Sequence, residues 1–323
     1  MPTAFVTGGS GFVGGRLVER LVAERWDVRA LARSDAAAAA VATRGAEPVR
    51  GDLGDRAALE AGAAGAEVAF HAAAKVDDWG PWGEFRRVNV DGTRSVVEAC
   101  RRAGVRRLVH VGTEAAILRG QALHGADETE PLAFDSPAPY AATKALAERV
   151  VLQGARQGFE TMVVRPRFVW GRGDTTLLPR MVTLARQGRL RWIGGGWHLT
   201  STTHVDNTVH GLMLAAERGR SGGVWFVTDG APVVFREFVA ELLRTQGVDP
   251  PDAELPTPVA AAAVAAAEAA YRRLPLRGAP PLTRFGLWFA TRECTLSDRR
   301  ARDELGYAPV TSRARGLAEL RGA

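Results

Sequence analysis

Cysteine is scarce in this sequence. Cys100 and Cys294 are the only two thiols among 323 residues. Two thiols cannot form a disulfide framework or the cysteine-rich ligand set of a structural zinc site. We therefore expect a fold stabilised by its hydrophobic core, no bound metal, and a cytoplasmic protein, since a reducing compartment fits this cysteine use.

Long apolar runs are also missing. No uninterrupted apolar stretch reaches the length of a bilayer span, and the start, MPTAFVTGGSGFVGG, lacks the features of a secretory signal peptide. The longest candidate, residues 259–270, is mostly alanine and contains Glu268, so it predicts a helix that does not span a membrane. Contact of this helix, or of residues 285–289, with a membrane surface stays open.

The charged residues form no block of one sign. The formal net charge is +6, from 42 basic and 36 acidic residues, but the charges are scattered along the chain. Proteins that bind nucleic acid usually concentrate their basic residues, so we expect no nucleic-acid partner. Apolar residues make up 46% of the chain, which is enough for a sizeable core.

Strand and helix patterns alternate through the first half of the chain. Short apolar strands are predicted at residues 4–7, 27–32, 47–50, 68–72, 107–112 and 161–165, and helices at residues 11–24, 89–103 and 140–158. Such alternation predicts an α/β fold with a doubly wound parallel sheet and helices on both faces. Ligands of these sheets bind at the carboxyl ends of the strands.

A glycine-rich run lies between the first strand and the first helix. It contains Gly8, Gly9, Ser10, Gly11, Phe12, Val13 and Gly14. A glycine at the first position permits a tight turn, one at the second lets a pyrophosphate approach the backbone, and one at the third lets the helix pack closely. The free N–H groups of the helix then face the phosphates. The run therefore predicts a dinucleotide site on a Rossmann sheet.

The ends of the second and third strands bear on cofactor choice. Sites that prefer NAD place an acidic residue at the end of the second strand, but this chain has Ala32 followed by Arg33. An arginine can pair with the 2′-phosphate of NADP, so we expect NADP(H) to be favoured over NAD(H). Asp52, after the third strand, can accept a hydrogen bond from the adenine amino group.

The pattern changes after residue 165, where glycine and proline become frequent and the alternation loosens. We expect residues 1–165 to form the NADP-binding Rossmann domain. Residues 166–323 would form mainly a smaller, interwoven substrate-binding region, part of which returns to the Rossmann domain. Residues 250–258 are interpreted as a linker before the alanine-rich helix.

Tyr140 and Lys144 are four residues apart in a predicted helix and therefore lie on one face. Hydride transfer to a carbonyl requires a proton at the oxygen, which a tyrosine can supply if its pKa is lowered. A neighbouring ammonium favours the phenolate and would lower that pKa. We predict that Tyr140 and Lys144 are catalytic, and that Lys144 also binds the nicotinamide ribose.

With these motifs the chain resembles the extended short-chain dehydrogenases/reductases. More narrowly, it resembles the bacterial branch of the 3β-hydroxysteroid dehydrogenase/isomerase group, near 2-alkyl-3-oxoalkanoate reductases and dihydroflavonol reductases. The segments that carry the resemblance beyond the two motifs are residues 28–33, 51–53, 70–75, 79–80, 89–93, 165–171 and 280–285. Extended members often form homodimers, and the resemblance implies pairing through residues 89–103 and 140–158.

The resemblance also implies further cofactor contacts. These come from Leu53 beside Asp52, from the loop Ala72, Ala73, Ala74 and Lys75, and from Pro166, Phe168 and Val169. A segment beginning at Asn89 would steady the neighbouring strand. In the family, the third catalytic residue is a serine or threonine after the strand at residues 107–112. By counting along the strand this position falls on Glu114, with Thr113 one residue earlier; we take Thr113, while Glu114 and a one-residue shift in register stay open.

The leading hypothesis is reversible reduction of a ketone on an apolar substrate, either steroid-like or a 3-oxo acid, with Tyr140 supplying the proton. Five tryptophans, Trp79, Trp82, Trp170, Trp192 and Trp197, are predicted in substrate-side loops and would suit an apolar ligand. One alternative is a nucleotide-sugar epimerase or dehydratase, although no Asn follows the Arg165-Pro166 segment to hold a nucleotide diphosphate. A second alternative is an NADP-sensing protein without catalysis.

Overall fold

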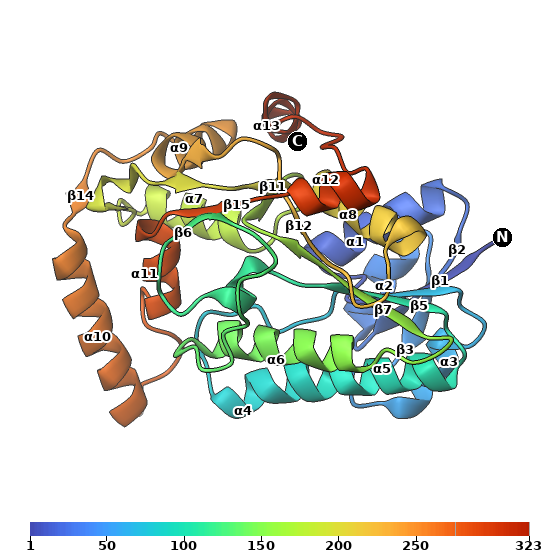
Figure 1. The fold of residues 1–323 in the computed structure, drawn as a ribbon. Helices are drawn as coiled ribbons and strands as arrows, with labels where there is room; N and C mark the ends of the chain where they lie inside the picture. Colours follow the sequence, from blue (N-terminus) through green and yellow to red (C-terminus); the bar gives the residue numbers. More distant parts are fainter. Residues whose placement is uncertain (275, 323) are drawn as a thin grey trace.

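The computed structural model describes residues 1–274 and 276–322. A seven-stranded parallel sheet in the order β12-β7-β5-β4-β1-β2-β3 forms its centre (Figure 1). The strands are β1 (Thr3–Thr7), β2 (Asp27–Ala32), β3 (Glu47–Arg50), β4 (Val68–His71), β5 (Arg107–Val111), β7 (Glu160–Pro166) and β12 (Val224–Val227). The predicted doubly wound parallel fold is confirmed.

Helices cover both faces of this sheet. Apolar side chains of α1 (Phe12–Ala23), α2 (Asp35–Thr43), α8 (Val205–Arg218) and α12 (Arg299–Leu305) share one core with it. On the opposite face α3 (Arg56–Ala63), α5 (Gly92–Arg102) and α6 (Pro139–Gln153) form a second core. In Figure 1, α5 and α6 lie below the sheet, and α1, α8 and α12 lie above it. Each helix buries one apolar stripe, as the spacing of Leu17, Val18 and Leu21 in α1 illustrates.

Two predicted helices differ from their expected bounds. The helix expected at residues 140–158 begins at Pro139 and ends at Gln153. Gly154 caps it, and Arg156 pairs with Phe159 in a short turn before β7. The helix expected at residues 89–103 starts earlier, because the short α4 (Trp82–Phe85) and the π-helical turn η1 (Arg86–Asp91) lead directly into α5.

The remaining elements form a smaller region at the carboxyl ends of the main strands. A four-stranded sheet has the order β13-β10-β15-β6, and two-stranded pairs join β11 to β8 and β14 to β9. These strands are β6 (Leu123–Ala126), β8 (Val169–Trp170), β9 (Trp192–Ile193), β10 (Leu199–Thr200), β11 (Thr203–His204), β13 (Val233–Val234), β14 (Glu254–Leu255) and β15 (Cys294–Leu296).

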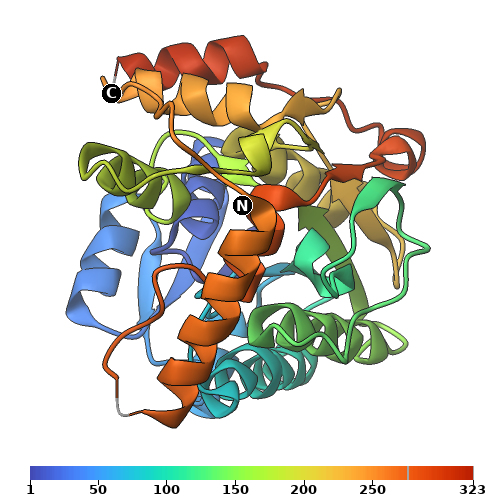
Figure 2. The ribbon, with the colours of Figure 1, turned by 90° about the vertical axis from the view of Figure 1, so that its left-hand side faces the viewer.

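Five longer helices complete this region. Side chains of α7 (Leu177–Arg186), α9 (Phe235–Thr245) and α13 (Arg313–Arg321) share a third core. The alanine-rich α10 (Thr257–Arg273) packs against α11 (Arg284–Thr291). Figure 2 shows α10 running along the front of the molecule. Helix α10 confirms the helix expected at residues 259–270, but residues 250–258 contain β14 and are more than a linker.

The chain crosses between the two regions more than once. β12 follows much of the smaller region yet pairs with β7 in the main sheet, whereas β6 precedes β7 yet belongs to the four-stranded sheet. A division of the molecule at residue 165 therefore remains a proposal. Within the described residues, every helix is too short or too polar to traverse a bilayer.

Candidate active site

The loop after β1 is shaped by glycines. Gly8 has φ of +79°, and a Cβ there would lie 2.6 Å from the backbone nitrogen of Ala73. A Cβ on Gly14 would lie 2.2 Å from the carbonyl oxygen of Gly8, so α1 packs directly against the loop. Gly11 precedes α1, and no described side chain caps that helix start. The first N–H groups of α1 are therefore free to bind an anion.

The other residues of this loop have different surroundings. Gly9 packs on the core, where a Cβ would lie 3.0 Å from that of Ala30. Ser10 is exposed, and Phe12 and Val13 are half-buried at the start of α1. The loop thus presents backbone and small side chains toward the carboxyl edge of the sheet, which fits the pyrophosphate of a dinucleotide.

The ends of β2 and β3 lie side by side at this edge, where Ala32 pairs with Arg50. Arg33 is exposed immediately after β2, and the hydroxyl of Ser34 accepts a hydrogen bond from the amide of Ala37 (3.2 Å) and caps α2. One carboxylate oxygen of Asp52 accepts a hydrogen bond from the amide of Gly54 (2.7 Å). This turn therefore uses part of the capacity of Asp52 to accept hydrogen bonds. Leu53 packs into the core against α5.

The loop after β4 passes beside the glycine loop. Ala72, Ala73 and Ala74 are half-buried, and the amide of Ala72 donates to the carbonyl of Thr7 (3.1 Å). The side-chain amide of Asn89 clamps the next residue: it accepts from the backbone N–H of Lys75 (2.7 Å) and donates to its carbonyl (3.1 Å). The ammonium of Lys75 pairs with Asp77 (2.7 Å) and Glu84 (3.4 Å).

The segment after β7 contains an unusual backbone conformation. Phe168 has φ of +43°, which is rare for a residue with a side chain and often marks a functional site. Its ring packs against Phe235, Phe238 and Phe289, so its side chain is committed to a core. Pro166 ends β7, and Val169 pairs with Thr203 in the small β8–β11 sheet.

Helix α6 brings Tyr140 and Lys144 to the carboxyl end of β5. The ammonium of Lys144 donates to the carbonyl of Val111 (2.8 Å) and lies 3.2 Å from Nε2 of His110. Tyr140 lies one turn earlier, within hydrogen-bonding reach of Thr113, and its ring contacts the edge of Phe285 at a centroid distance of 5.5 Å. The structure therefore groups all three predicted catalytic residues.

A buried ion pair fixes α6 against the sheet. Nε of Arg165 in β7 donates to Oε2 of Glu148 in α6 (2.9 Å), and a second hydrogen bond joins the same two side chains. Both side chains are buried, and a bidentate pair of this kind restricts rotation as well as separation. The pair sets the position of Lys144 one turn away.

The ionisation of the two central residues follows from burial. Burial lowers the pKa of Lys144 to about 8, partly offset by the carboxylate of Glu148. Desolvation raises the pKa of the Tyr140 phenol, the negative charge of Glu114 adds to this, and the Thr113 hydroxyl opposes it. The expectation of a lowered Tyr140 pKa is wrong for the protein without cofactor, because burial and the charge of Glu114 dominate.

An ion pair of Glu114 bears on whether Thr113 or Glu114 fills the third catalytic position. Oε1 of Glu114 accepts from Nη1 of Arg167 (2.6 Å), and its Oε2 accepts from the hydroxyl of Thr113 (2.7 Å). A carboxylate that accepts from a guanidinium has no proton to donate to a substrate carbonyl. Glu114 is therefore unsuited to the hydroxyl role, whereas Thr113 lies beside Tyr140 and retains a hydroxyl.

The tryptophans expected to bind substrate serve mainly in packing. Trp170 and Trp192 are buried in the third core, and their indole nitrogens donate to Asp229 and to the carbonyl of Pro251. The interpretation as ligand contacts is wrong for these two, because the third core buries them instead. Trp79 packs against Tyr271, and Trp82 and Trp197 are exposed.

Two buried histidines were missed by sequence reasoning. His71 ends β4 and His110 lies in β5, with their ring centroids 5.0 Å apart. The hydroxyls of Thr7 and Thr93 flank the two ring nitrogens of His71 at 2.7 and 2.9 Å. A polar residue inside an apolar strand was the available signal, but its partner Lys144 is 34 residues away in the chain.

These features together can carry out carbonyl chemistry. The glycine loop and the free start of α1 fit a dinucleotide phosphate, and the loop after β4 leads from there to Tyr140, Thr113 and Lys144. A phenol, a hydroxyl and an ammonium lie near the carboxyl end of β5, where a substrate oxygen would receive a hydrogen bond and a proton.

Comparison with known proteins matches this geometry. Residues 5–257 match the model of the 3-beta hydroxysteroid dehydrogenase/isomerase family. A 4-hydroxy-2-methyl-3-oxo-4-farnesyl-3,4-dihydroquinoline-1-oxide ketoreductase from Stigmatella aurantiaca is 47% identical, over 99% of this chain and 96% of that protein. A 2-alkyl-3-oxoalkanoate reductase from Stenotrophomonas maltophilia is 39% identical, over 98% of this chain and 97% of that protein.

Solved structures share the whole architecture. MoeE5 in complex with UDP-glucose and NAD aligns with a TM-score of 0.76 at 26% identity, covering 99% of this chain and 97% of that one. A dTDP-glucose 4,6-dehydratase, DesIV from Streptomyces venezuelae, with NAD and TYD bound aligns with a TM-score of 0.77 at 26% identity, covering 99% and 96%.

Proposed function

Because the chain belongs to the 3-beta hydroxysteroid dehydrogenase/isomerase family, we propose that it reduces a ketone on an apolar substrate with a preference for NADP(H). It is an oxidoreductase of the short-chain dehydrogenase/reductase type and uses a nicotinamide dinucleotide. The observation that carries the proposal is the grouping of Tyr140, Thr113 and Lys144 beside the glycine loop.

The bound nicotinamide would supply the hydride that reaches the carbonyl carbon. Tyr140 donates a proton to the carbonyl oxygen, and the Thr113 hydroxyl, which donates to Glu114 in the protein alone, turns to that oxygen and holds it by a hydrogen bond. The Lys144 ammonium stabilises the phenolate that remains. With a pKa of about 8, Lys144 keeps its proton at neutral pH and can play this part.

The preference for NADP(H) rests on the end of β2. Arg33 is exposed there, no carboxylate occupies the adjoining position Ala32, and Ser34 caps α2, whose first residue Asp35 pairs with Arg50 (2.9 Å). A guanidinium and a helix start attract a phosphate, whereas an acidic residue would repel one. These groups would hold the 2′-phosphate.

The substrate class rests on the relatives and on the lining of the site. The two bacterial relatives are named for a farnesylated oxo-quinoline and for 2-alkyl-3-oxoalkanoates, which are both ketones with a large apolar part. In this chain the side chains nearest Tyr140 in the smaller region are aromatic, with Phe285 in edge contact and Trp288 beside it. We therefore propose an apolar ketone.

Nucleotide-sugar chemistry is not favoured. A dehydratase needs an additional acid beside the catalytic tyrosine, and the only nearby carboxyl group of this kind in the described residues, Glu114, is held by Arg167. The sensor alternative is not favoured either, because Tyr140, Lys144 and Thr113 are all present and grouped.

Titration of the protein with NADPH and with NADH tests the cofactor proposal. We expect NADPH to bind more tightly, and Arg33→Ala to remove about 10- to 100-fold of that advantage, as for loss of a charged hydrogen bond. Arg56→Ala, an exposed arginine paired with Glu60, is the matched control and should leave both affinities unchanged. Equal affinities in the wild type, or no effect of Arg33→Ala, would contradict the proposal.

Substitution of the proton donor tests the chemistry. Tyr140→Phe should lower kcat for an apolar ketone by about 100- to 10,000-fold, because general acid catalysis is worth that much. NADPH affinity should be retained within a few-fold. Wild-type-like turnover by Tyr140→Phe would exclude the assigned proton donor.

A further inference from the structure

Two buried histidines lie near the catalytic Lys144. His71 ends β4, and His110 pairs with it across the sheet in β5. Both side chains are buried, with exposed fractions of 0% and 1%. Neither side chain takes part in the proposed ketone reduction. A polar ring in the middle of a sheet destabilises the fold unless hydrogen bonds replace its lost hydration, so each ring requires partners inside the protein.

Hydrogen bonds fix the tautomer of His71. The hydroxyl of Thr93 donates to the carbonyl of Asn89 (2.5 Å), so the oxygen of that hydroxyl accepts from Nε2 of His71 (2.9 Å). Nδ1 of the same ring then lacks a proton and accepts from the hydroxyl of Thr7 (2.7 Å). Burial lowers the pKa of His71 to about 3, so the ring is neutral at physiological pH. The two threonines satisfy both nitrogens of His71.

His110 has a charged partner instead. Its Nε2 lies 3.2 Å from the ammonium of Lys144, which carries three protons and can only donate. Nε2 must therefore be unprotonated, and the proton of the neutral ring lies on Nδ1. Nδ1 faces the backbone of His71 but makes no hydrogen bond of good geometry within the described residues. The contact with Lys144 is thus the one side-chain hydrogen bond that His110 makes in residues 1–274 and 276–322.

The ammonium of Lys144 has two acceptors, and both belong to β5. The carbonyl of Val111 accepts one N–H (2.8 Å), and Nε2 of His110 accepts another (3.2 Å). An ammonium has three N–H groups, so one remains for the Tyr140 phenolate or a cofactor hydroxyl. Because a tetrahedral group with two directions fixed has its third direction fixed as well, β5 determines where this last N–H points.

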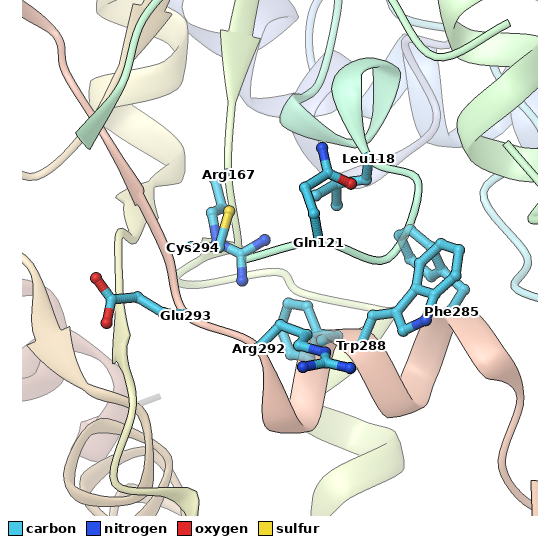
Figure 3. Close-up of a pocket in the computed structure, with 9 residues that line it drawn as sticks. Leu118, Gln121, Arg167, Phe285, Trp288, Arg292, Glu293 and Cys294 are labelled. Atoms are coloured by element: carbon cyan, nitrogen blue, oxygen red, sulfur yellow. The ribbon is translucent and has the colours of Figure 1, made fainter. Parts of the chain in front are cut away.

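The charged side chains around this ammonium are engaged elsewhere. Glu148 of α6 forms its bidentate pair with Arg165 of β7. Glu114 is held by Arg167 (2.6 Å), whose guanidinium faces the side chains of α11 (Figure 3). In the described part of the chain, the ammonium is therefore contacted by neutral acceptors alone, and His110 is the one that a side chain supplies.

We propose that His110 is a positioning residue for the reaction: its Nε2 accepts one N–H of Lys144 and thereby aims the remaining N–H at the Tyr140 phenolate. His71 supports this arrangement, because its ring lies 5.0 Å from that of His110 and is itself held by two threonines. The assignment rests on the proposed ketone reduction and deepens it, since it names the group that orients the catalytic ammonium.

Nuclear magnetic resonance of histidine-labelled protein tests the tautomers without substrate or cofactor. In spectra that correlate ring nitrogens with ring protons, we expect the proton of His110 on Nδ1 and that of His71 on Nε2. The signals are assigned by their loss in His110→Gln and in His71→Gln. A His110 proton on Nε2 would overturn the proposal, because that nitrogen could not accept from Lys144.

The pH dependence of kcat for ketone reduction tests the effect on Lys144. His110→Leu removes the acceptor, whereas His110→Gln places an amide oxygen near the position of Nε2. A hydrogen bond to an ammonium favours its charged form, so His110→Leu should move the alkaline limb of the profile down by about one pH unit. His110→Gln should keep the limb near its wild-type position, and KM for NADPH should change little in either variant.

Leu108→Val is the matched control for a purely structural effect. Leu108 is fully buried two residues earlier in β5, and loss of one methylene group there destabilises the protein without removing an acceptor of Lys144. This variant should leave the alkaline limb in place. Urea unfolding compares its stability with that of His110→Leu, and an equal shift of the limb in both variants would count against the proposal.

The outcomes separate this inference from the function on which it rests. If His110→Leu and His110→Gln move the limb equally, or if neither moves it, the positioning role is wrong and the ketone chemistry stands. If the wild type reduces no ketone, the pKa of Lys144 decides, obtained from urea unfolding of the wild type and Lys144→Met between about pH 6 and pH 10.5. A lower pKa in the His110→Leu background supports the contact, and an unchanged pKa overturns it. Should His110→Leu fail to fold, the tautomer of His110 in the wild type decides.

Discussion

At the scale of single residues, Lys144 is notable because its charged ammonium is buried. Its ammonium is buried beside His110 and the carbonyl of Val111, and the tilted ring of His71 lies 5.0 Å from that of His110. Burial lowers the pKa of His71 to about 3 and that of His110 well below its usual value, so both rings are neutral at physiological pH. The lysine charge therefore has no ion-pair partner in direct contact among the described residues, and burial lowers its pKa to about 8.

This pKa predicts a pH-dependent stability difference between the wild type and Lys144→Met. The unfolded lysine has its usual pKa of 10.5 and binds more protons than the folded one between pH 8 and 10.5. The wild type should therefore gain about 3 kcal/mol of unfolding free energy relative to the variant across that window. Urea unfolding at pH 7 and pH 10.5 measures the difference.

Lys75→Met is the matched control, because Asp77 raises the pKa of Lys75 and so reverses the sign. Whatever stability this ion pair contributes is fully present below the unfolded pKa and is lost only above it. The stability difference between wild type and Lys75→Met should therefore stay constant from pH 7 to about pH 10. A constant difference for Lys144→Met as well would contradict the buried charge.

At the scale of elements, the position of α1 depends on close contact with the glycine loop. The first turn of the helix approaches Gly8 so closely that any side chain at position 14 would overlap its carbonyl oxygen. Helix α6 is fixed differently, by the Glu148–Arg165 pair. The glycines without side chains thus fix the position of α1 at the phosphate end of the site. A buried ion pair fixes the position of α6 at the catalytic end.

Gly14→Ala should both destabilise the protein and weaken cofactor binding. The added Cβ would lie 2.2 Å from the oxygen of Gly8, so the loop or the helix must move. Overpacking of this kind costs about 1–3 kcal/mol, which urea unfolding would detect, and NADPH titration would show the lost affinity.

Gly83→Ala provides the comparison, because a Cβ there meets nothing within 4 Å. It lies in α4, where alanine is preferred to glycine, so stability should be unchanged or rise by up to about 1 kcal/mol. If Gly14→Ala behaved like Gly83→Ala, the close approach would have no energetic consequence.

At the scale of the whole molecule, one carboxylate ties the loop after β4 to the smaller region. Asp78 lies in the loop after β4, and its Oδ2 accepts from the hydroxyl of Thr283 at the start of α11 (3.0 Å) and from Arg180 of α7 (3.3 Å). The loop that borders the cofactor side is thereby tied to two helices of the smaller region.

Asp78→Ala should loosen this connection. We expect KM for an apolar ketone to rise about 3- to 10-fold, as for loss of one or two hydrogen bonds, with NADPH affinity unchanged. Steady-state kinetics measures the effect. Asp77→Ala, which removes an exposed partner of Lys75, should leave KM within two-fold, and an equal rise in both variants would argue against the tie.

The sequence predicts the main sheet well because each strand is a short apolar run that can be recognised from its own residues. Predicted strands at residues 27–32 and 47–50 coincide with β2 and β3, and the motif residues fall at strand ends as expected. Helix ends were less predictable: the helix predicted to run to residue 158 ends at Gln153, where Gly154 caps it, and Arg156 then pairs with Phe159.

The parts of the site that the sequence did not reveal depend on long-range contacts. Arg167 and Glu114 are 53 residues apart, and neither follows a periodic pattern that would predict the pair. The interpretation of the tryptophans failed for a related reason. An aromatic residue in a glycine-rich segment can face a ligand or a core, and only the three-dimensional packing shows that Trp170 and Trp192 face a core.

The late return of β12 to the sheet has a consequence for how the protein is made. Six strands of the main sheet have been synthesised once the chain reaches Pro166, but β12, the strand that covers the edge of β7, ends only at Val227. During that interval the nascent chain exposes an unpaired edge of buried, apolar residues, a surface that promotes association between chains. The pairing of β12 with β7 thus both completes the sheet and ends the interval in which the exposed strand edge can associate with other chains.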